Sequence, residues 1–423
     1  MTTTPTSPPA AAVGETTGPF SWYRSLPPQG RRAFKGAFGG YALDSYDFLV
    51  LPMGMVAIAA YFGLSTAQTG LLTTVTLLSS ALGGVVAGGL IDRVGRVRTL
   101  MISVTTYALF TVLCGFAMNY PMLLGLRALQ GIGFGGEWAA GAILVAEYAG
   151  ARYRGRVLAW VQSAWAVGWA LAVIVGTVVM DNVDQDVAWR VLFWTGAMPA
   201  LLLVYVRRNV KDAREVTERM AKKQARAPLS SVFRGGLARK TLFATLLSTG
   251  VMGGYYTVAT WLPAYLKNER GLTVVGTGGY LFVLIGGAFC GYITAGHLVD
   301  RLGRRIVFAL FAFLSAGLLM AYVNIPQGSN SLLLILGFPL GFSASAIFSG
   351  FGSYLAELYP GAVRGTGQSF SYNVGRALGA IFPTAVGFSS AGVGGALVYG
   401  AFGYGLALVA LLGLPETRGT ELT

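Results

Sequence analysis

Long apolar segments, each bounded by short polar stretches, constrain this 423-residue chain more than any other feature. A helix needs about 20 residues to cross the hydrocarbon core of a bilayer. Segments of that length lie at residues 34–62, 70–91, 99–118, 121–147, 156–180, 187–206, 241–266, 277–299, 305–325, 331–357, 366–388 and 394–414. Only 11% of the residues are charged, against about 25% in soluble domains. The sequence therefore predicts an all-α membrane protein with twelve transmembrane helices.

The basic residues test this topology, because loops rich in Lys and Arg stay in the cytoplasm. If the N-terminus is cytoplasmic, 26 of the 31 Lys and Arg residues fall in inside loops. Outside loops keep Arg190, Lys267 and Arg270, and the remaining two, Arg127 and Arg376, fall inside helices. The net charge of +14 thus reflects topology, so we expect a lipid bilayer, and no nucleic acid, as its partner. An even number of spans places both termini in the cytoplasm.

Two motifs occur twice in the chain. The stretch GGLIDRVGR at 88–96 returns as GHLVDRLGR at 296–304, which places Asp92 and Asp300 208 residues apart. Glu147, followed by Arg154, returns 210 residues later as Glu357, followed by Arg364. Two motif pairs at one spacing indicate a duplicated six-helix unit. We therefore expect a disordered cytoplasmic tail (1–30), an N-terminal six-helix bundle (31–206), a cytoplasmic amphipathic linker (207–240), a C-terminal six-helix bundle (241–415) and a cytoplasmic tail (416–423).

The paired loop motif, together with Arg127-x-x-x-Gly131-x-Gly133, resembles the major facilitator superfamily over about residues 30–415. The stretches LDSYDF (43–48), GGEW (135–138) and YNVGR (372–376) look like those of proton symporters of organic anions. The sialate, lactate, metabolite and aromatic-acid types share such patterns. Ser45 stands where many of those relatives have Gly, and GGEW fits the aromatic-acid type less well. The resemblance implies a multi-pass protein of the bacterial inner membrane.

Charged residues inside membrane helices are candidates for function, because burying a charge in hydrocarbon is costly. Asp44 and Asp47 share a face of the first helix, and two carboxylates so close cannot both ionise cheaply, so at least one should hold and release a proton. Alternatively, one of them only pairs with Arg127. The resemblance implies proton transfer for Arg127. Glu137, on the same stripe of the fourth helix, is either its structural partner or a second proton site.

Arg376 lies in mid-helix with Tyr372 and Asn373 on the same face. A guanidinium grips a carboxylate through two parallel hydrogen bonds and stays charged throughout a transport cycle. We expect Arg376 to bind the carboxylate of the substrate; otherwise it forms a salt bridge to an acid of the other half. Expected substrate-binding walls are Tyr372, Asn373, Tyr41, Gln162, Trp165, Trp169, Tyr255, Tyr256, Trp261 and Ser349, although each aromatic residue could serve packing alone.

The repeated loops lie at helix ends, where aspartates can cap helices and bind arginines across an interface. A gating role is therefore expected for Asp92, Arg93, Arg96, Glu147, Arg154, Asp300, Arg301, Arg304, Glu357 and Arg364, with topology determination as the alternative.

These observations together predict a monomeric secondary transporter that imports a small organic anion with protons by alternating access. A proton-coupled exporter is the first alternative, although residues 156–180 lack the proline that the fifth helix of exporters usually carries. A non-transporting sensor on the same scaffold is the second. An enzyme is not expected, because the chain has no phosphate-binding or nucleophile-elbow motif. With one His and two Cys, it should bind no metal and no cofactor.

Overall fold

The computed structural model describes residues 21–149, 154–210, 229–361, 363–389 and 392–418. Every predicted span is a helix or a pair of helices in line. The first half, after the short α1 (Ser21–Arg24), contains α2 (Pro28–Phe62), α3 (Thr66–Val94), α4 (Arg96–Cys114), α5 (Tyr120–Tyr148), α6 (Arg154–Asn182), α7 (Gln185–Trp194), η1 (Thr195–Ala197) and α8 (Pro199–Asn209). The sixth span is α7 to α8, interrupted by the 3₁₀ turn η1.

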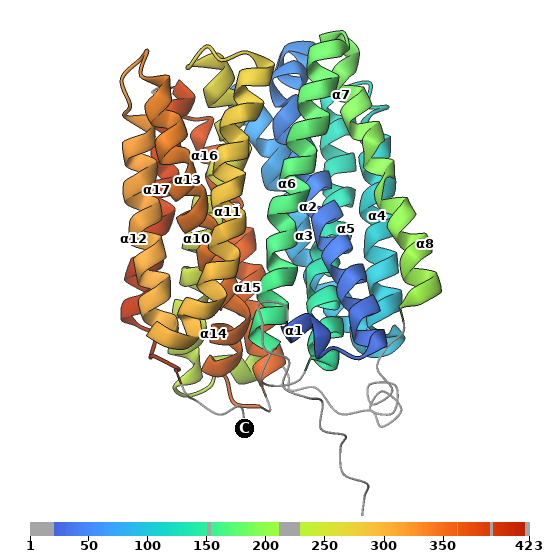
Figure 1. Cartoon of the computed structure of the whole chain (residues 1–423), viewed down its shortest axis with the longest axis vertical. Helices are drawn as coiled ribbons and strands as arrows, with labels where there is room; N and C mark the ends of the chain where they lie inside the picture. Colours follow the sequence, from blue (N-terminus) through green and yellow to red (C-terminus); the bar gives the residue numbers. More distant parts are fainter. Residues whose placement is uncertain (1–20, 150–153, 211–228, 362, 390–391, 419–423) are drawn as a thin grey trace, which may run out of the picture.

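The second half repeats this order after η2 (Leu229–Phe233). It contains α10 (Leu237–Asn268), α11 (Val274–Leu302), α12 (Arg304–Val323), α13 (Asn330–Ala346), η3 (Ile347–Gly350), α14 (Phe351–Leu358), α15 (Arg364–Gly379), α16 (Ile381–Val386) and α17 (Gly392–Leu412). Figure 1 shows the first half in blue and green beside the second half in yellow to red. The protein is all-α, with two bundles of six spans, as the sequence predicts.

Nine helical segments in the described part are long and apolar enough to cross a membrane. The inner helix α10 falls short of that test, because Thr, Ser, Gly and Tyr residues interrupt its apolar run, and α15, with 16 residues, is too short for it. Nearly every residue of α10 between Thr241 and Leu266 is buried, so these polar side chains meet protein and not lipid. Polar residues in a membrane helix normally face the bundle interior in this way.

The internal repeat extends from sequence to backbone and packing. Gly95 and Gly303, 208 residues apart, have nearly the same φ, 97° and 98°, which is a conformation that favours glycine. Gly131 of α5 lies so close to the Thr76 carbonyl that a Cβ would overlap it, and Gly341 of α13 meets the Leu284 carbonyl in the same way. Such contacts let helices pack closely where no hydrophobic effect drives them together. The bundles therefore share one construction.

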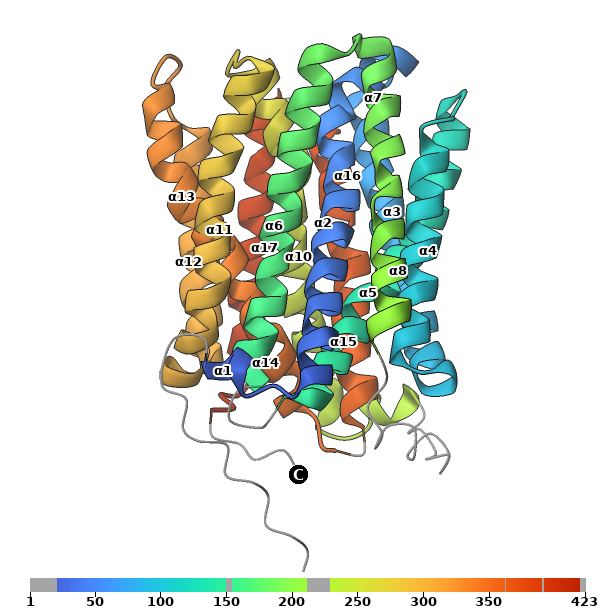
Figure 2. The same ribbon diagram turned by 45° about the vertical axis from the view of Figure 1, so that its right-hand side comes forward.

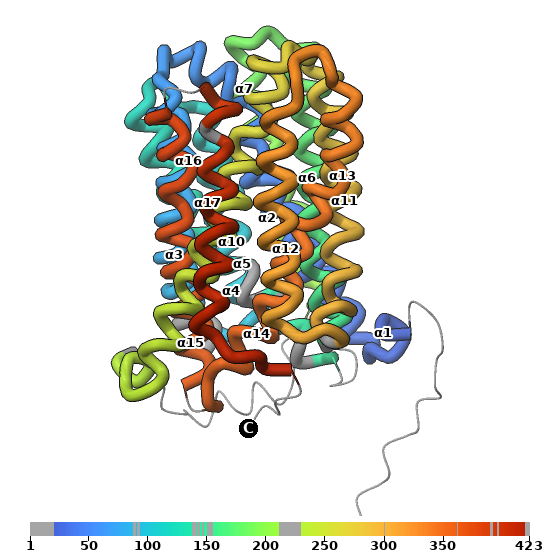
Figure 3. The backbone as a smooth tube through the Cα atoms, turned by 90° about the vertical axis from the view of Figure 1, so that its left-hand side faces the viewer, coloured from blue at the N-terminus to red at the C-terminus, as the bar shows by residue number. Residues whose placement is uncertain are grey.

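In the described part of the chain the two bundles meet mainly through α2 with α10, α3 with α15 and with α16, and α6 with α11. Figure 2 shows α6 beside α11, and Figure 3 shows α16 beside α3. Helix α1 and the last described residues lie at one end of the molecule, here called the α1 end (Figure 1).

The eleventh span is broken at Ala380, between α15 and α16. The break leaves carbonyl groups that the helix cannot satisfy internally. Thr74 of α3, in the other bundle, donates its hydroxyl to the Ala380 carbonyl at 2.5 Å. Trp261 of α10 donates its indole N–H to the Pro383 carbonyl at 2.9 Å. The broken helix is thus held in part by the opposite bundle.

Candidate functional site

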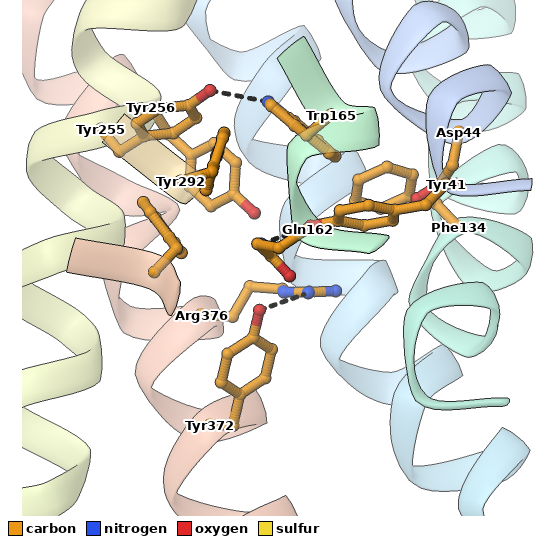
Figure 4. A pocket seen from close by; sticks show the side chains of 11 residues that line it. Tyr41, Asp44, Phe134, Gln162, Trp165, Tyr255, Tyr256, Tyr292, Tyr372 and Arg376 are labelled. Carbon is orange, nitrogen blue, oxygen red and sulfur yellow. Dashed lines mark hydrogen bonds between the residues drawn. The ribbon is translucent and has the colours of Figure 1, made fainter. Parts of the chain in front are cut away.

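A buried cavity lies between the two bundles (Figure 4). Its walls come from α2, α5 and α6 on one side and from α10, α11, η3 and α15 on the other. The lining residues are Tyr41, Asp44, Phe134, Gln162, Trp165, Tyr255, Tyr256, Tyr292, Phe348, Tyr372 and Arg376. Its volume is about 20 Å³, which is room for about one water molecule. The bundles must separate before an organic molecule can enter.

Arg376 supplies a positive charge to this cavity. Its side chain is 5% exposed and reaches across the cavity from α15 (Figure 4). One terminal nitrogen donates to the Tyr372 hydroxyl at 3.4 Å, four residues earlier on the same helix. The guanidinium carbon lies 5.7 Å from the ring centre of Phe134 in the other bundle and 5.1 Å from that of Tyr372. Aromatic faces stabilise the cation without neutralising it, which leaves its charge for a ligand.

Aromatic side chains from both bundles form most of the remaining wall. Trp165 of α6 donates its indole N–H to the Tyr255 hydroxyl of α10 at 2.6 Å, across the cavity. Gln162, one turn earlier, donates to the Tyr41 hydroxyl at 3.0 Å. Such a wall presents flat apolar faces with polar tips, which is the usual composition of a small-molecule site.

Asp44 is the acid of the cavity wall and is 1% exposed. Its Oδ1 atom has no hydrogen-bond partner among the described residues. Asp44 lies close enough to Glu137, Asp47 and Arg376 to interact with their charges electrostatically. Glu137 itself is fully buried behind the wall, against Gly40 of α2, and neither carboxyl oxygen has a partner in the described structure. Buried carboxylate oxygens without hydrogen-bond partners are costly when the group is ionised.

Asp47 and Arg127 lie outside the cavity wall. Asp47 is fully buried in the first bundle, where Gln130 of α5 donates its amide to the carboxylate. Arg127 is also fully buried, near Asp47 and Cys114, and its three side-chain nitrogens have no hydrogen-bond partner within the described residues. The predicted acids and Arg127 therefore form one buried group of charges that reaches the cavity only through Asp44.

Eight predicted residues do line the cavity: Tyr41, Asp44, Gln162, Trp165, Tyr255, Tyr256, Tyr372 and Arg376. Asn373 does not, because its amide donates to the Ser369 carbonyl at 3.0 Å and its side chain packs against Gly84 of α3. Ser349 lies behind the wall and donates to the Tyr292 carbonyl at 2.8 Å. Sequence reasoning missed Phe134, Tyr292 and Phe348 as wall residues, because no charge distinguishes them from packing aromatics.

The predicted gate can be followed only in part, because the side chains of Asp92, Arg93, Glu147, Arg154 and Asp300 lie outside the described residues. Arg304 makes a two-pronged ion pair with Glu357, at 2.9 and 3.0 Å, within the second bundle. Arg364 donates to the Ala356 carbonyl at 3.0 Å, Arg301 is exposed, and Arg96 is half-buried. These contacts bind helix ends within a bundle, and gating by them stays a prediction.

Glu416 plays the helix-capping part that the sequence predicted for aspartates of the repeated loops. Its carboxylate accepts the backbone N–H groups of Arg304 at 2.9 Å and Arg305 at 3.0 Å, at the start of α12. Burial alone would raise the pKa of Glu416, but these and further backbone hydrogen bonds hold the pKa below its ordinary value. A negative charge at a helix N-terminus is stabilising. No charge pattern in the sequence distinguished this residue.

The described residues contain no group of three or more His, Cys, Asp or Glu side chains placed to hold a metal ion.

Comparison with known proteins identifies the family of this chain. The model of the Major Facilitator Superfamily matches residues 37–382. The chain is 40% identical over 406 residues to a probable 4-methylmuconolactone transporter of Cupriavidus pinatubonensis, covering 95% of this chain and 94% of that protein. It is 33% identical over 373 residues to a cis,cis-muconate transport protein of Acinetobacter baylyi, covering 85% and 87%.

A crystal structure of a D-xylose-proton symporter has the same fold, with a TM-score of 0.73 and 21% identity, covering 92% of this chain and 99% of that one. The fold with two bundles, the cavity between them and the similarity in sequence to transporters all point to the same family. The chain belongs to the major facilitator superfamily and is a multi-pass membrane transporter, not an enzyme.

Proposed function

We propose that this protein imports a small, flat, unsaturated or aromatic carboxylate together with protons, by alternating access. The observation that carries the proposal is the cavity between the bundles, where Arg376 faces aromatic walls and a buried acid, Asp44. The carboxylate of the substrate binds the guanidinium of Arg376 through two hydrogen bonds. The hydroxyl of Tyr372, four residues earlier on α15, steadies that guanidinium.

The aromatic walls support a flat substrate. Trp165, Tyr255 and Tyr256 offer ring faces and edges on which a planar conjugated system packs well. Relatives named for muconolactone and muconate transport agree with this choice, since both names denote unsaturated organic acids.

The buried acids support proton coupling. Asp44 shares the cavity with Arg376, and Asp47 and Glu137 lie close behind it. A proton on Asp44 removes its charge and leaves Arg376 to attract the anion. Release of the substrate and release of the proton are then linked, because each makes the other more favourable.

The basic loops support the direction. By the positive-inside rule the α1 end faces the cytoplasm, and the proton gradient of a bacterial inner membrane drives uptake toward it. The cavity is complete within one chain, so a monomer suffices.

Transport by proteoliposomes tests the proposal. Asp44→Asn or Asp47→Asn should abolish accumulation driven by a pH gradient and preserve exchange of labelled for unlabelled substrate. Unchanged pH dependence in both variants would show that coupling lies elsewhere.

The substrate is tested separately. A thermal-shift screen of the purified protein should show stabilisation by benzoate, nicotinate and unsaturated carboxylates. Stabilisation by neutral sugars or organic cations alone would overturn the choice of a carboxylate.

A further inference from the structure

The cavity wall contains few side chains that can carry a charge. Its lining residues are all described, and among them Arg376 is the cation and Asp44 the acid. The remaining nine are tyrosines, phenylalanines, Trp165 and Gln162, all uncharged. One ionised carboxylate on a ligand therefore has a charged partner, and a second would have none.

Other buried arginines do not change this inventory. Arg127 lies behind the wall in the first bundle, beside Asp47. Arg190 donates to the carbonyls of Gly115 and Ala117, both at 2.9 Å, and Arg270 donates to that of Ile325 at 2.6 Å. Arg190 and Arg270 both bind loop carbonyl groups and lie outside the cavity lining.

Two neutral donors of the wall are already engaged with wall tyrosines. The indole N–H of Trp165 donates to Tyr255, and the amide of Gln162 donates to Tyr41. A second carboxylate would have to displace these bonds or use uncharged tyrosine hydroxyls, in a small space that also holds Asp44. Burying an ionised group without a charged partner is costly.

From this inventory we infer that the site accepts organic ions with a single ionised carboxylate and rejects dicarboxylates. The inference rests on the proposed function and adds the charge of the substrate to it. With Asp44 protonated the cavity wall carries +1, which a monoanion neutralises and a dianion overshoots to −1. The names of the relatives leave this open, since one denotes a lactone and the other a dicarboxylate.

Pairs of ligands that differ by one charge test the inference. At neutral pH, 4-carbamoylbenzoate and terephthalate have nearly the same size and planarity, but one carries one ionised carboxylate and the other two. Fumaramate and fumarate form a shorter pair of the same kind. Titration of the purified wild-type protein should give affinities at least about tenfold higher for the monoanion of a pair. Benzoate serves as a reference monoanion.

A gain-of-function variant sharpens the test. Gln162→Arg adds a second cation to the wall opposite Arg376, and the preference for the monoanion should shrink or reverse. Gln327→Arg adds the same charge at an exposed loop position outside the cavity lining and should keep the preference of the wild type.

The outcomes distinguish a failure of the charge inference from a failure of the proposed function. Equal or tighter binding of terephthalate or fumarate by the wild type overturns the charge inference and leaves a carboxylate transporter standing. Should none of the monoanions or dianions bind, the proposed function falls and the inference falls with it. If Gln162→Arg does not fold, the wild-type pairs still decide.

Discussion

The two bundles share a construction but differ in their buried charges. In the described structure the first bundle buries Asp44, Asp47, Arg127 and Glu137, whereas the second buries Arg376 at the cavity and Arg270 at a loop. The repeat spacing of 208–210 residues takes Asp44 to 252–254, Asp47 to 255–257, Arg127 to 335–337 and Glu137 to 345–347. None of those positions holds a charged residue.

The close packing of helices is the same in the two bundles, whereas the buried charged residues differ. Gly131 and Gly341 meet carbonyl oxygens of neighbouring helices in the same way, at corresponding places. The close helix contacts belong to the duplicated unit, and the charges distinguish its two copies. Under the proposed function, this difference assigns proton handling to the first bundle and anion binding to the second, and the two meet at the cavity.

Removing the anion-binding group of the second bundle should have the largest effect. Arg376→Lys keeps the charge but loses the planar pair of N–H groups, so we expect a loss of about 2 kcal/mol or more in transition-state binding. Uptake at low substrate concentration should fall at least about 30-fold. Arg208→Lys, at the exposed end of α8, is the matched control and should transport normally. Normal uptake by Arg376→Lys would move the carboxylate site elsewhere and break the comparison.

Disturbing the acids of the first bundle should come next. A Cβ at Gly40 would overlap Oε1 of Glu137, whereas a Cβ at Gly141 would lie 3.5 Å from the same atom. Gly40→Ala should therefore displace the carboxylate, with a strain of about 1–3 kcal/mol, and reduce proton-driven uptake more than counterflow. Gly141→Ala should be tolerated. If both variants accumulate substrate alike, Glu137 takes no part in coupling.

Weakening the contact between the bundles should have a smaller effect. Trp165→Phe removes the indole donor to Tyr255, a hydrogen bond worth about 1 kcal/mol. The contracted cavity should become less stable relative to separated bundles, and bound ligand should leave severalfold faster in stopped-flow release. Trp169→Phe makes the same change in ring size and keeps the Trp165–Tyr255 bond. Equal release rates in the two variants would mean that this bond does not hold the cavity closed.

Glu416→Gln should have the smallest effect, confined to the stability of the second bundle. The folded pKa of Glu416 is lowered, so its contribution is present above the unfolded pKa of about 4.3 and is lost as pH falls through the folded value. The side chain is exposed, so solvent screening keeps the contribution below about 1 kcal/mol. Thermal unfolding in detergent should separate wild type and variant at neutral pH, and the difference should vanish in acid. A difference that grows in acid would contradict the capping role.

The sequence predicted the fold almost completely, because span length, basic loops and paired motifs are local or periodic signals. Arg376, Asp44, Gln162 and Trp165 were identifiable because charge or polarity in a membrane helix is costly without a role. Tyr292 and Phe348 were not, since aromatic residues are ordinary on apolar helices and only the packing of η3 against α11 brings them together. Asn373 was misplaced because shared helical phase with Arg376 does not settle which of two neighbours a side chain contacts.

The hydroxyl of Thr74 donates to the carbonyl of the broken helix across the boundary between the bundles, here called the seam. This bond makes water a participant in the transport cycle. When the bundles part at that place, the hydroxyl and the Ala380 carbonyl lose each other as partners, and water is the group that reaches an opened boundary first. Solvent must then enter with the opening movement and leave with the closing one. Osmotic pressure thereby becomes an input to the conformational equilibrium: solutes too large to enter the crevice should hold the seam shut and slow turnover without touching the substrate site.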